Sequence, residues 1–363
     1  MDFGCSEYSN LLAEFTRIPE GVRYTSFALT VTTCVLGLAG NAIVIFVTGF
    51  LLKKHESKIW FLNLALADFV FSLCLPLFAV GLFTGNWPLG EHLCNVHNYI
   101  STCNMYASIF IITALTIDRV LSVVVPIWHR KFISRRVRSW TCVILWVITG
   151  LLSIPVVIAN EGFFYGSTVQ CRMVHAASTN IVIYDEERFY DSQSIMGTVT
   201  IRREWKTNRG WAGSSSQTVL PTKCVHEIFS SAFSTGAIPI SFLVIGYFIP
   251  LTVILCSNVV IIVKGFQSHA MKSPKLFRVV TAVITFFFLT WTPLITAQIT
   301  AMAALRGGNL RLPVRLYRLM PLLCSIAYTN SCINPFIYVF VGSHVRKAIR
   351  DFLGRRGRDL SRS

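Results

Sequence analysis

The chain has 363 residues, of which 53% are hydrophobic and only 14% are charged. A soluble domain carries about 25% charged residues, so this composition excludes an ordinary soluble enzyme and favours helices buried in lipid. The formal net charge of +16 is concentrated in short segments between apolar stretches. This distribution indicates contact with anionic lipid and a cytosolic partner rather than with nucleic acid.

Seven apolar stretches are each long enough to cross a bilayer. In hydrocarbon the backbone must satisfy its own polar groups, so stretches of this length without strict alternation predict helices. The spans are 24–51, 58–83, 91–124, 138–158, 236–263, 275–303 and 316–341. We therefore expect an all-α membrane protein with a seven-transmembrane helix bundle over 24–341.

The charges of the connecting segments predict the orientation of the bundle. Residues 1–23 are mixed and polar, without the apolar core of a cleavable signal peptide, and are expected to form an extracellular N-terminus. The segments that would then face the cytoplasm hold most of the excess of Lys and Arg, as the positive-inside rule requires. They are 52–57, 125–137, 264–274 and 342–363. The expected location is the plasma membrane, with multiple crossings.

Segment 159–235 is far longer than the other connections and is expected to be a long second extracellular loop. It begins with a predicted hairpin from Phe163 to Val174, with Gly166 in the turn. Long loops without regular structure are usually functional or disordered, and much of 176–220 is expected to be mobile.

The last segment, 342–363, is expected to form a short amphipathic eighth helix and a cytoplasmic tail. Apolar residues stand at helical spacing with basic residues on the other face, which is typical of a helix lying on the inner membrane surface. A frayed basic tail is the alternative. The apolar positions are Val345, Ile349, Phe352 and Leu353.

One acid, Asp68, lies well inside the predicted bilayer, where it needs a cation or hydrogen-bond donors. Side chains able to supply oxygens or N–H groups are Asn41, Asn104, Ser108, Asn330 and Asn334. A carboxylate surrounded by hydroxyl and amide oxygens suits a small hard cation such as sodium. A hydrogen-bonded contact between helices, without any ion, is the alternative.

A second acid, Asp118, stands beside Arg119 where the third span meets the cytosol. An arginine held by its neighbouring acid can be released when a helix moves, although an ordinary interfacial ion pair is the alternative. Pro250, Pro293 and Pro335 lie inside later spans, and each removes a backbone hydrogen bond and leaves a hinge. Such hinges suit a bundle that opens on one side.

Eight motifs in order resemble the rhodopsin-like (class A) G-protein-coupled receptors across nearly all of residues 24–353. They are GN at 40–41, LALAD at 64–68, Cys94, DRV at 118–120, Trp146, Pro250, WTP at 291–293 and NPFIY at 334–338. By this resemblance Arg119, beside Asp118, is the switch that faces the G protein. Further switch residues would be Phe287, Trp291, Pro293, Asn334, Pro335 and Tyr338. An allosteric sodium pocket would comprise Asp68, Asn104, Ser108, Asn330 and Asn334, and Cys94 would bridge to Cys171.

Longer matches, such as PKLFRVVTAVITFFFLTWTP, are similar to the chemoattractant receptors for complement anaphylatoxins, formyl peptides and chemerin. The chain departs from that cluster at Phe242, where an arginine usually holds a ligand carboxylate, and at Asn258, where a tyrosine is usual. Ser101 and Thr102 stand where amine receptors place an aspartate, and Tyr328 where opsins place the retinal lysine. Amine and retinal ligands are therefore not expected.

The extracellular charges favour two opposite kinds of ligand. Tyr184 and Tyr190 stand beside acids, a pattern for tyrosine sulfation that could dock a basic protein; an ordinary acidic loop is the alternative. Four arginines could attract an acidic peptide or a lipid carboxylate, or simply be surface charge: Arg306, Arg311, Arg315 and Arg318. With Ser101, Thr102 and Phe242 they are the ligand-facing candidates. Cys5 and Cys224 form a second disulfide or stay free.

These observations predict a receptor rather than an enzyme, since no nucleophile–base pair or metal cluster is evident. The resemblance implies a peptide or lipid chemoattractant, an inhibitory-class heterotrimeric G protein, arrestin, and a role in leukocyte chemotaxis and inflammation. The alternatives are a non-signalling scavenger receptor, motivated by Asn258 and by few phosphorylation sites in the tail, a receptor for an acidic lipid mediator, and a transporter. No internal repeat supports the transporter.

Overall fold

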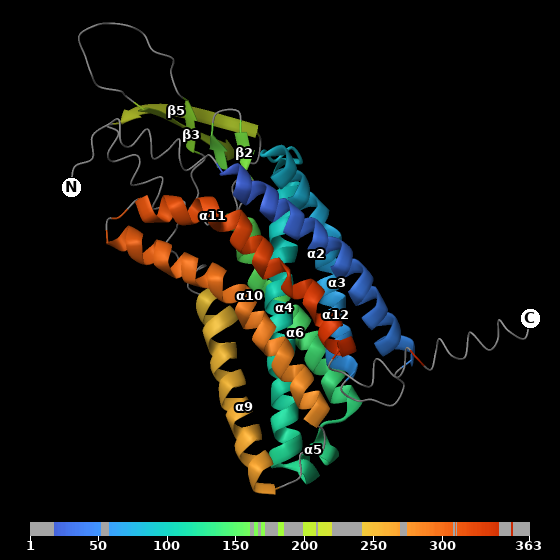
Figure 1. The fold of residues 1–363 in the computed structure, drawn as a ribbon. Coiled ribbons are helices and arrows are strands. Elements are labelled where there is room, and N and C mark those ends of the chain that lie inside the picture. The colour runs from blue at the N-terminus through green and yellow to red at the C-terminus, as the bar shows by residue number, and fades with distance from the viewer. Residues whose placement is uncertain are drawn as a thin grey trace, which may run out of the picture.

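The computed structural model describes residues 18–51, 58–159, 242–268, 274–307 and 311–340, together with five strands between 163 and 219 and the single residues Asn309 and Arg350. The helices pack side by side as a bundle, and the strands lie at one end of it (Figure 1). The opposite end carries the short helix α5 (Pro126–Phe132). Helix 8, over 342–363, lies outside the described residues apart from Arg350.

A helix occupies each of the seven predicted spans. The long helices are α2 (Glu20–Phe46), continued by the π-helical turn η1 (Val47–Leu51), α3 (Lys58–Thr84), α4 (Gly90–Val124), α6 (Arg135–Ala159), α9 (Ile249–Ser268), preceded by η2 (Val244–Phe248), and α10 (Pro274–Arg306). The seventh span consists of α11 (Arg311–Tyr328) and α12 (Asn330–Phe340). Within the described residues, six helices are by themselves long and apolar enough to cross a membrane, and the seventh crossing is divided at Thr329.

Two prolines inside the spans, Pro335 and Pro250, have the expected local effect, because each leaves one carbonyl of its helix without a donor. Pro335 leaves the carbonyl of Ser331 free, and Asn41 on α2 donates its Nδ2–H to that oxygen at 2.8 Å. The π-helical turn η2 ends just before Pro250 on α9. The wider turn accommodates the hydrogen bond that Pro250 cannot make, without a donor from another helix.

Close packing of α2 against α12 explains one glycine of the GN motif. A Cβ placed on Gly40 would lie 2.8 Å from Cβ of Pro335, which is closer than real Cβ contacts. Glycine therefore lets the two helices approach, and this contact keeps Asn41 within reach of the carbonyl that Pro335 frees.

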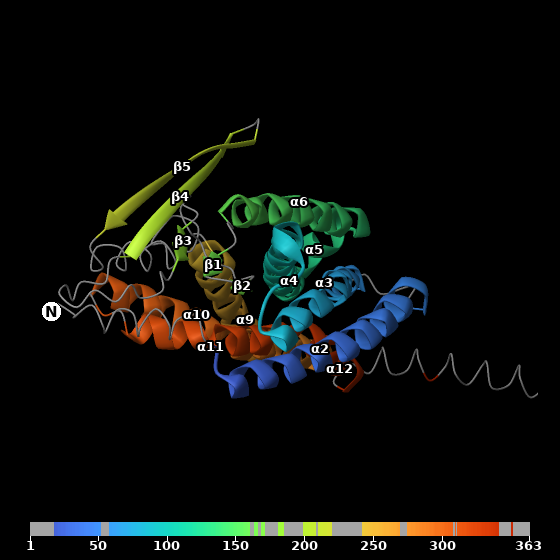
Figure 2. The same ribbon diagram turned by 90° about the horizontal axis from the view of Figure 1, so that it is seen from above.

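Helix α4 has the most central position in the bundle, between α3 and α6 when the bundle is viewed from above (Figure 2). Its inward face is apolar and fully buried at Ile109, Ile112 and Leu115, which join one core with Phe287 of α10 and Ile254 of α9. The outward faces of the helices also carry many apolar side chains. Such surfaces are stable only in lipid, as expected for membrane-spanning helices.

The predicted hairpin at the start of the long loop is present as β1 (Phe163–Tyr165) and β2 (Thr168–Gln170), which pair antiparallel. Three more strands follow where the sequence predicts a mobile segment: β3 (Ile181–Tyr184), β4 (Val199–Thr207) and β5 (Gly210–Val219). They join the first two in one sheet of order β2-β1-β3-β4-β5. Pairing with neighbouring strands satisfies the backbone N–H and C=O groups of these strands. This pairing joins segments that are distant in the sequence, so the local sequence pattern of each segment does not predict it.

Candidate functional site

A buried polar centre surrounds Asp68 in the middle of the bundle, at the junction of α3, α4 and α12. The Asp68 side chain is fully buried. Asn334 donates its Nδ2–H to Asp68 Oδ2 at 2.8 Å. When the amide nitrogen of Asn104 faces Asp68, it donates to Oδ1 at 3.2 Å, and the amide oxygen accepts from the Ser331 hydroxyl at 2.9 Å. The carboxylate therefore joins three helices.

Several buried oxygens of the residues predicted for this pocket have no hydrogen-bond partner in the described part of the chain. They are Oγ of Ser108 and Oδ1 of Asn330 and Asn334. An unpaired buried oxygen normally costs about 1–3 kcal/mol, so these atoms call for a donor or a cation. Carboxylate, amide and hydroxyl oxygens are the ligands that small hard cations prefer, and the residues present therefore fit sodium.

Ser331 also belongs to this centre, although it is not among the residues predicted for the pocket. Its hydroxyl contacts Asn104, and its carbonyl contacts Asn41. A signal for it was available, because Ser331 lies three residues before Asn334 on a helix and shares its face.

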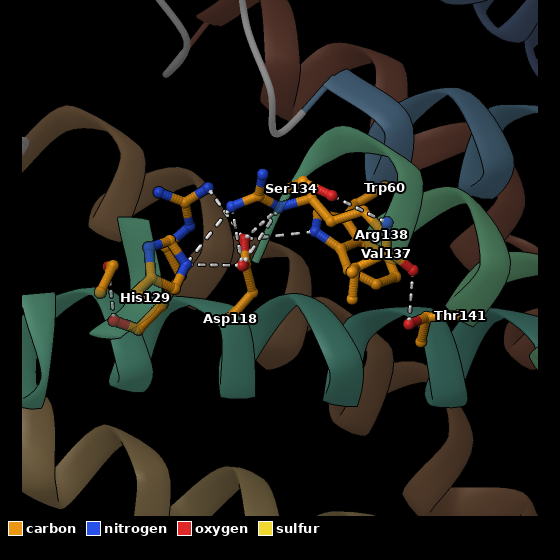
Figure 3. A network of polar contacts seen from close by, with 9 residues as sticks. Trp60, Asp118, His129, Ser134, Val137, Arg138 and Thr141 are labelled. Carbon is orange, nitrogen blue, oxygen red and sulfur yellow. Dashed lines mark hydrogen bonds and ion pairs between the residues drawn. The ribbon is translucent and has the colours of Figure 1, made fainter. Parts of the chain in front are cut away.

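A second buried centre surrounds Asp118 at the end of α4 that precedes α5 (Figure 3). Arg138 of α6 lies with Nη2 at 3.1 Å and Nε at 3.2 Å from Asp118 Oδ1. His129 of α5 has Nε2 at 2.9 Å from the same oxygen, and Trp60 of α3 donates Nε1–H to Oδ2 at 3.3 Å. One carboxylate thus fastens α3, α5 and α6 to α4.

Arg119 is the more distant cation of this centre. Its Nη2 lies 3.7 Å from Asp118 Oδ2, and its side chain is 21% exposed, whereas that of Arg138 is 2% exposed. The pair of neighbours predicted from the sequence is therefore present, but Asp118 makes its closer contacts with Arg138 and His129. Arg119 is therefore the more exposed of the two arginines beside Asp118.

Local sequence explains how α5 and α6 bring these groups to Asp118. Pro126 starts α5, where its missing N–H costs nothing, and His129 lies one turn later. Ser134 precedes α6 and accepts the Val137 N–H with its hydroxyl at 3.4 Å, which is the geometry of an N-cap. Arg138 then lies one turn into α6. The sequence offers no signal that its side chain turns inward.

The aromatic residues among the predicted switches, Phe287, Trp291 and Tyr338, lie in the core. Trp291 stacks on Phe287 with ring centroids 5.9 Å apart, and Tyr338 meets Phe61 edge-on at 4.9 Å. The Trp291 Nε1 and the Tyr338 hydroxyl are buried without a hydrogen-bond partner in the described residues. Pro293 lies on the outward face of α10, and Pro335 is buried against α2. None of these contacts shows that the residues change position during activation.

The ligand-facing candidates are distributed over the end of the bundle that carries the strands. Ser101 is buried and donates to the Tyr328 hydroxyl at 3.1 Å, Thr102 is buried, and Phe242 meets Tyr106 edge-on at 5.9 Å. Arg306, Arg311 and Arg315 are exposed, and Arg318 is half-buried. The arginines are therefore more exposed than the buried pair of Ser101 and Tyr328.

Cys94 is disulfide-bonded, while its predicted partner Cys171 lies outside the described residues. Cys5, Cys224 and Tyr190 also lie outside them, and of Tyr184 only the backbone, at the end of β3, is described. The two disulfides and the sulfated tyrosines therefore stay predictions.

Two further residues that the sequence singled out make local contacts. Asn258 donates its Nδ2–H to the Ile254 carbonyl of its own helix at 3.0 Å. Trp146 donates Nε1–H to Asn63 Oδ1 at 3.0 Å and so joins α6 to α3.

Comparison with known proteins identifies the family of this arrangement. The family described as "7 transmembrane receptor (rhodopsin family)" matches residues 40–201 and 207–338. The chain belongs to this family. It is a class A G-protein-coupled receptor rather than an enzyme, and it is similar to the chemoattractant receptor cluster.

Three relatives show where in the family the chain stands. It is 29% identical to mouse (Mus musculus) chemerin-like receptor 1, over 86% of this chain and 74% of the relative. It is 29% identical to the C3a anaphylatoxin chemotactic receptor of Oncorhynchus mykiss, over 90% and 76%. It is also 29% identical to the type-1 angiotensin II receptor B of Rattus norvegicus, over 86% and 76%.

Proposed function

We propose that this receptor lies in the plasma membrane with its N-terminus outside, binds a chemoattractant peptide of the anaphylatoxin type and activates inhibitory-class heterotrimeric G proteins. The names of the relatives, a chemerin-like receptor and a C3a chemotactic receptor, support the ligand class. Arrestin would bind the same inner face, and the response would be leukocyte chemotaxis in inflammation.

The observation that carries the coupling role is the arrangement at the end of the bundle with α5. There Arg119 is partly exposed, and Asp118 makes closer contacts with His129 and Arg138 than with Arg119. Beside it, α5 exposes apolar side chains, with Ile127 86% and Phe132 49% exposed. A guanidinium next to an apolar, basic surface suits a partner that buries a helix there.

A ligand screen with a direct readout of G-protein dissociation tests this proposal. Cells expressing the chain would meet anaphylatoxins, formyl peptides, chemerin peptides and acidic lipids in parallel, with dissociation followed by energy transfer between labelled G-protein subunits. Dissociation by a peptide of the first three groups supports the proposal. Peptide uptake without dissociation from any G-protein class contradicts it.

Uptake alone would favour the second candidate, a scavenger receptor of the same fold. Asn258 supports that candidate, because it stands where a tyrosine is usual and its amide is bonded to its own helix rather than to a neighbouring one.

A receptor for an acidic lipid mediator is the third candidate, supported by the exposed Arg306, Arg311 and Arg315. Sulfated Tyr184 and Tyr190 would instead favour a basic protein ligand.

Asp68, Asn104, Ser108, Asn330 and Asn334 would hold an allosteric sodium ion, with Ser331 positioning Asn104. Bound sodium would supply positive charge beside the Asp68 carboxylate. Because a cation that binds one packing of the bundle better than the other shifts the equilibrium between them, sodium would alter agonist affinity.

The Asp68→Asn variant is expected to remove this sodium effect. The asparagine keeps the shape of the side chain but lacks the charge that attracts a cation. Agonist affinity would be measured in sodium chloride and in N-methylglucamine chloride at equal ionic strength. A sodium effect that is as large in Asp68→Asn as in the wild type contradicts the assignment.

The Cys94→Ala and Cys171→Ala variants are each expected to reduce surface expression or ligand binding strongly, because loss of a native disulfide typically costs about 2–5 kcal/mol. Flow cytometry of an N-terminally tagged receptor measures the first effect. Cys256→Ala is the control, since Cys256 is a free cysteine on the outward face of α9. If both variants behave like Cys256→Ala, the two cysteines do not pair.

A further inference from the structure

Ser134 is an exposed serine in the link between α5 and α6. The link consists of Ile133 and Ser134, which belong to neither helix. The backbone of Ile133 has φ −89° and ψ 77°, which lies outside the helical region. The Ser134 hydroxyl accepts the Val137 N–H at 3.4 Å (Figure 3). This bond is longer than the usual range, so the hydroxyl is held weakly and stays open to solvent.

Cations surround this serine on both sides in the sequence. Four of them are exposed: Arg130, Lys131, Arg135 and Arg136. The sequence holds no acid between residues 119 and 159. In the part of the chain that the structure describes, none of these four cations forms an ion pair. A cluster of one sign without counter-charges attracts anions.

The start of α6 carries charge of the unfavourable sign. A helix N-terminus has a partial positive charge and favours acids, whereas the first turn of α6 holds Arg135 and Arg136 and no acid. Arg135 also repels the charge of Lys58, the first residue of α3, although Lys58 is only 8% exposed. Among the described residues, these three cations have no ion-pair partner. A negative group at this point would therefore be favourable.

Two serines of this region have cations three and four residues before them. They are Ser134, which follows Arg130 and Lys131, and Ser139, which follows Arg135 and Arg136. Charge patterns of this kind select substrates for protein kinases, and peptide segments are commonly bound in extended form, with their main-chain groups free. Ser139 is exposed but lies inside α6, which would have to unwind. Ser134 lies outside both helices, so the structure favours Ser134.

We propose that Ser134 is a phosphorylation site for a cytosolic protein kinase with an acidic substrate groove. In the transfer, Ser134 Oγ forms a bond to the γ-phosphorus of a nucleoside triphosphate. The bond between that phosphorus and the oxygen bridging it to the β-phosphorus breaks, and the nucleoside diphosphate leaves. The hydroxyl proton passes to the catalytic base of the kinase and then to solvent.

The phosphate would supply the negative group that the start of α6 favours. It adds about −1.5 to −2 charge and three acceptor oxygens, beside the first N–H groups of α6, which have no partner inside the helix. It also stands two residues after Phe132, on the exposed apolar surface of α5 that is proposed to meet the G protein. A charged group in an apolar interface raises the desolvation cost of burying that interface, so phosphorylation would oppose coupling.

Kinase labelling of the intact receptor tests the proposal. The purified receptor, in phosphatidylcholine nanodiscs, would be incubated with ATP and the catalytic domain of protein kinase C, which acts on basic segments. Phosphorylated peptides would be mapped by mass spectrometry. Phosphate is expected on Ser134, and Ser139 should stay unmodified.

Matched variants complete the test. Ser134→Asn keeps a good N-cap for α6 but removes the acceptor hydroxyl, so labelling of this segment should be lost while surface expression is kept. Ser139→Ala should be labelled like the wild type. Lys131→Gln should slow the labelling of Ser134 at least about tenfold, because the loss of one charge-assisted hydrogen bond has about that effect. The proposal is overturned if Ser134 stays unlabelled, if Ser139 is labelled in its place, or if Lys131→Gln is labelled as fast as the wild type.

The inference rests on the proposed orientation of the receptor, which places Ser134 in the cytosol. The labelling reaction needs neither a ligand nor a G protein, so its outcome is independent of the proposed coupling. A receptor that couples to no G protein but is labelled at Ser134 would still contain the site. A receptor that responds to an anaphylatoxin but stays unlabelled at Ser134 would lack it.

Discussion

The Arg138→Met variant is expected to destabilise the receptor strongly. Arg138 is buried and holds Asp118 through two nitrogens, and methionine fills similar space without charge. Removing one partner of a buried ion pair typically costs about 3–5 kcal/mol, and the remaining cation, Arg119, is more distant from Asp118, at 3.7 Å. At roughly 2 °C per kcal/mol for a chain of this size, the unfolding midpoint of the purified receptor should fall by about 6 °C or more, as followed with a thiol-reactive dye.

A double-mutant cycle separates this ion pair from general packing. In Asp118→Asn/Arg138→Met neither charge is left unpaired, so the loss should be smaller than the sum of the two single variants. Arg135→Met is the control, because Arg135 is exposed three residues earlier on α6 and should change stability by at most about 0.5 kcal/mol. An Arg138→Met midpoint equal to that of Arg135→Met would show that Asp118 does not depend on Arg138.

The second large effect is expected for signalling. Arg119→Ala should reduce ligand-driven G-protein activation at least about tenfold, because hydrogen bonds from a charged donor contribute about 1.5–3 kcal/mol each. Ligand affinity should be preserved, since Asp118 keeps its closer contacts with Arg138 and His129. Nucleotide exchange on purified G protein and saturation binding of a labelled ligand measure the two quantities.

Arg119→Lys distinguishes charge from geometry at this position. Lysine keeps the charge but lacks the planar fork of donors, so activation should recover only in part. Full activation by Arg119→Ala would remove this residue from the coupling surface. Loss of both activation and ligand binding would instead assign it a structural role.

Much of the fold follows from the sequence because lipid imposes a simple rule. Long apolar stretches must be helices, and the seven predicted spans coincide with helices in the structure. Of the prolines predicted to disturb those helices, Pro335 frees the Ser331 carbonyl for Asn41 and Pro250 follows a π-helical turn, whereas α10 continues without a break through Pro293. The break at Thr329 was not predicted, since neither proline nor glycine stands there.

The Asp68 centre was largely predictable because a buried carboxylate requires polar side chains beside it. A carboxylate in hydrocarbon needs polar neighbours, and among few polar side chains at that depth, Asn104 and Asn334 do contact it. The predicted pocket omitted Ser331, and the sequence did not indicate which amide atoms would be left without partners.

The sequence by itself determined that the chain crosses a membrane and where its helices run, since these properties depend on apolar length and local backbone chemistry. Only the tertiary structure decided that Asp118 joins Trp60, His129 and Arg138 instead of principally binding its neighbour Arg119. Asp118 and its three partners come from four helices, and their meeting depends on how those helices pack and turn. Packing between distant segments leaves no periodic pattern in any one of them.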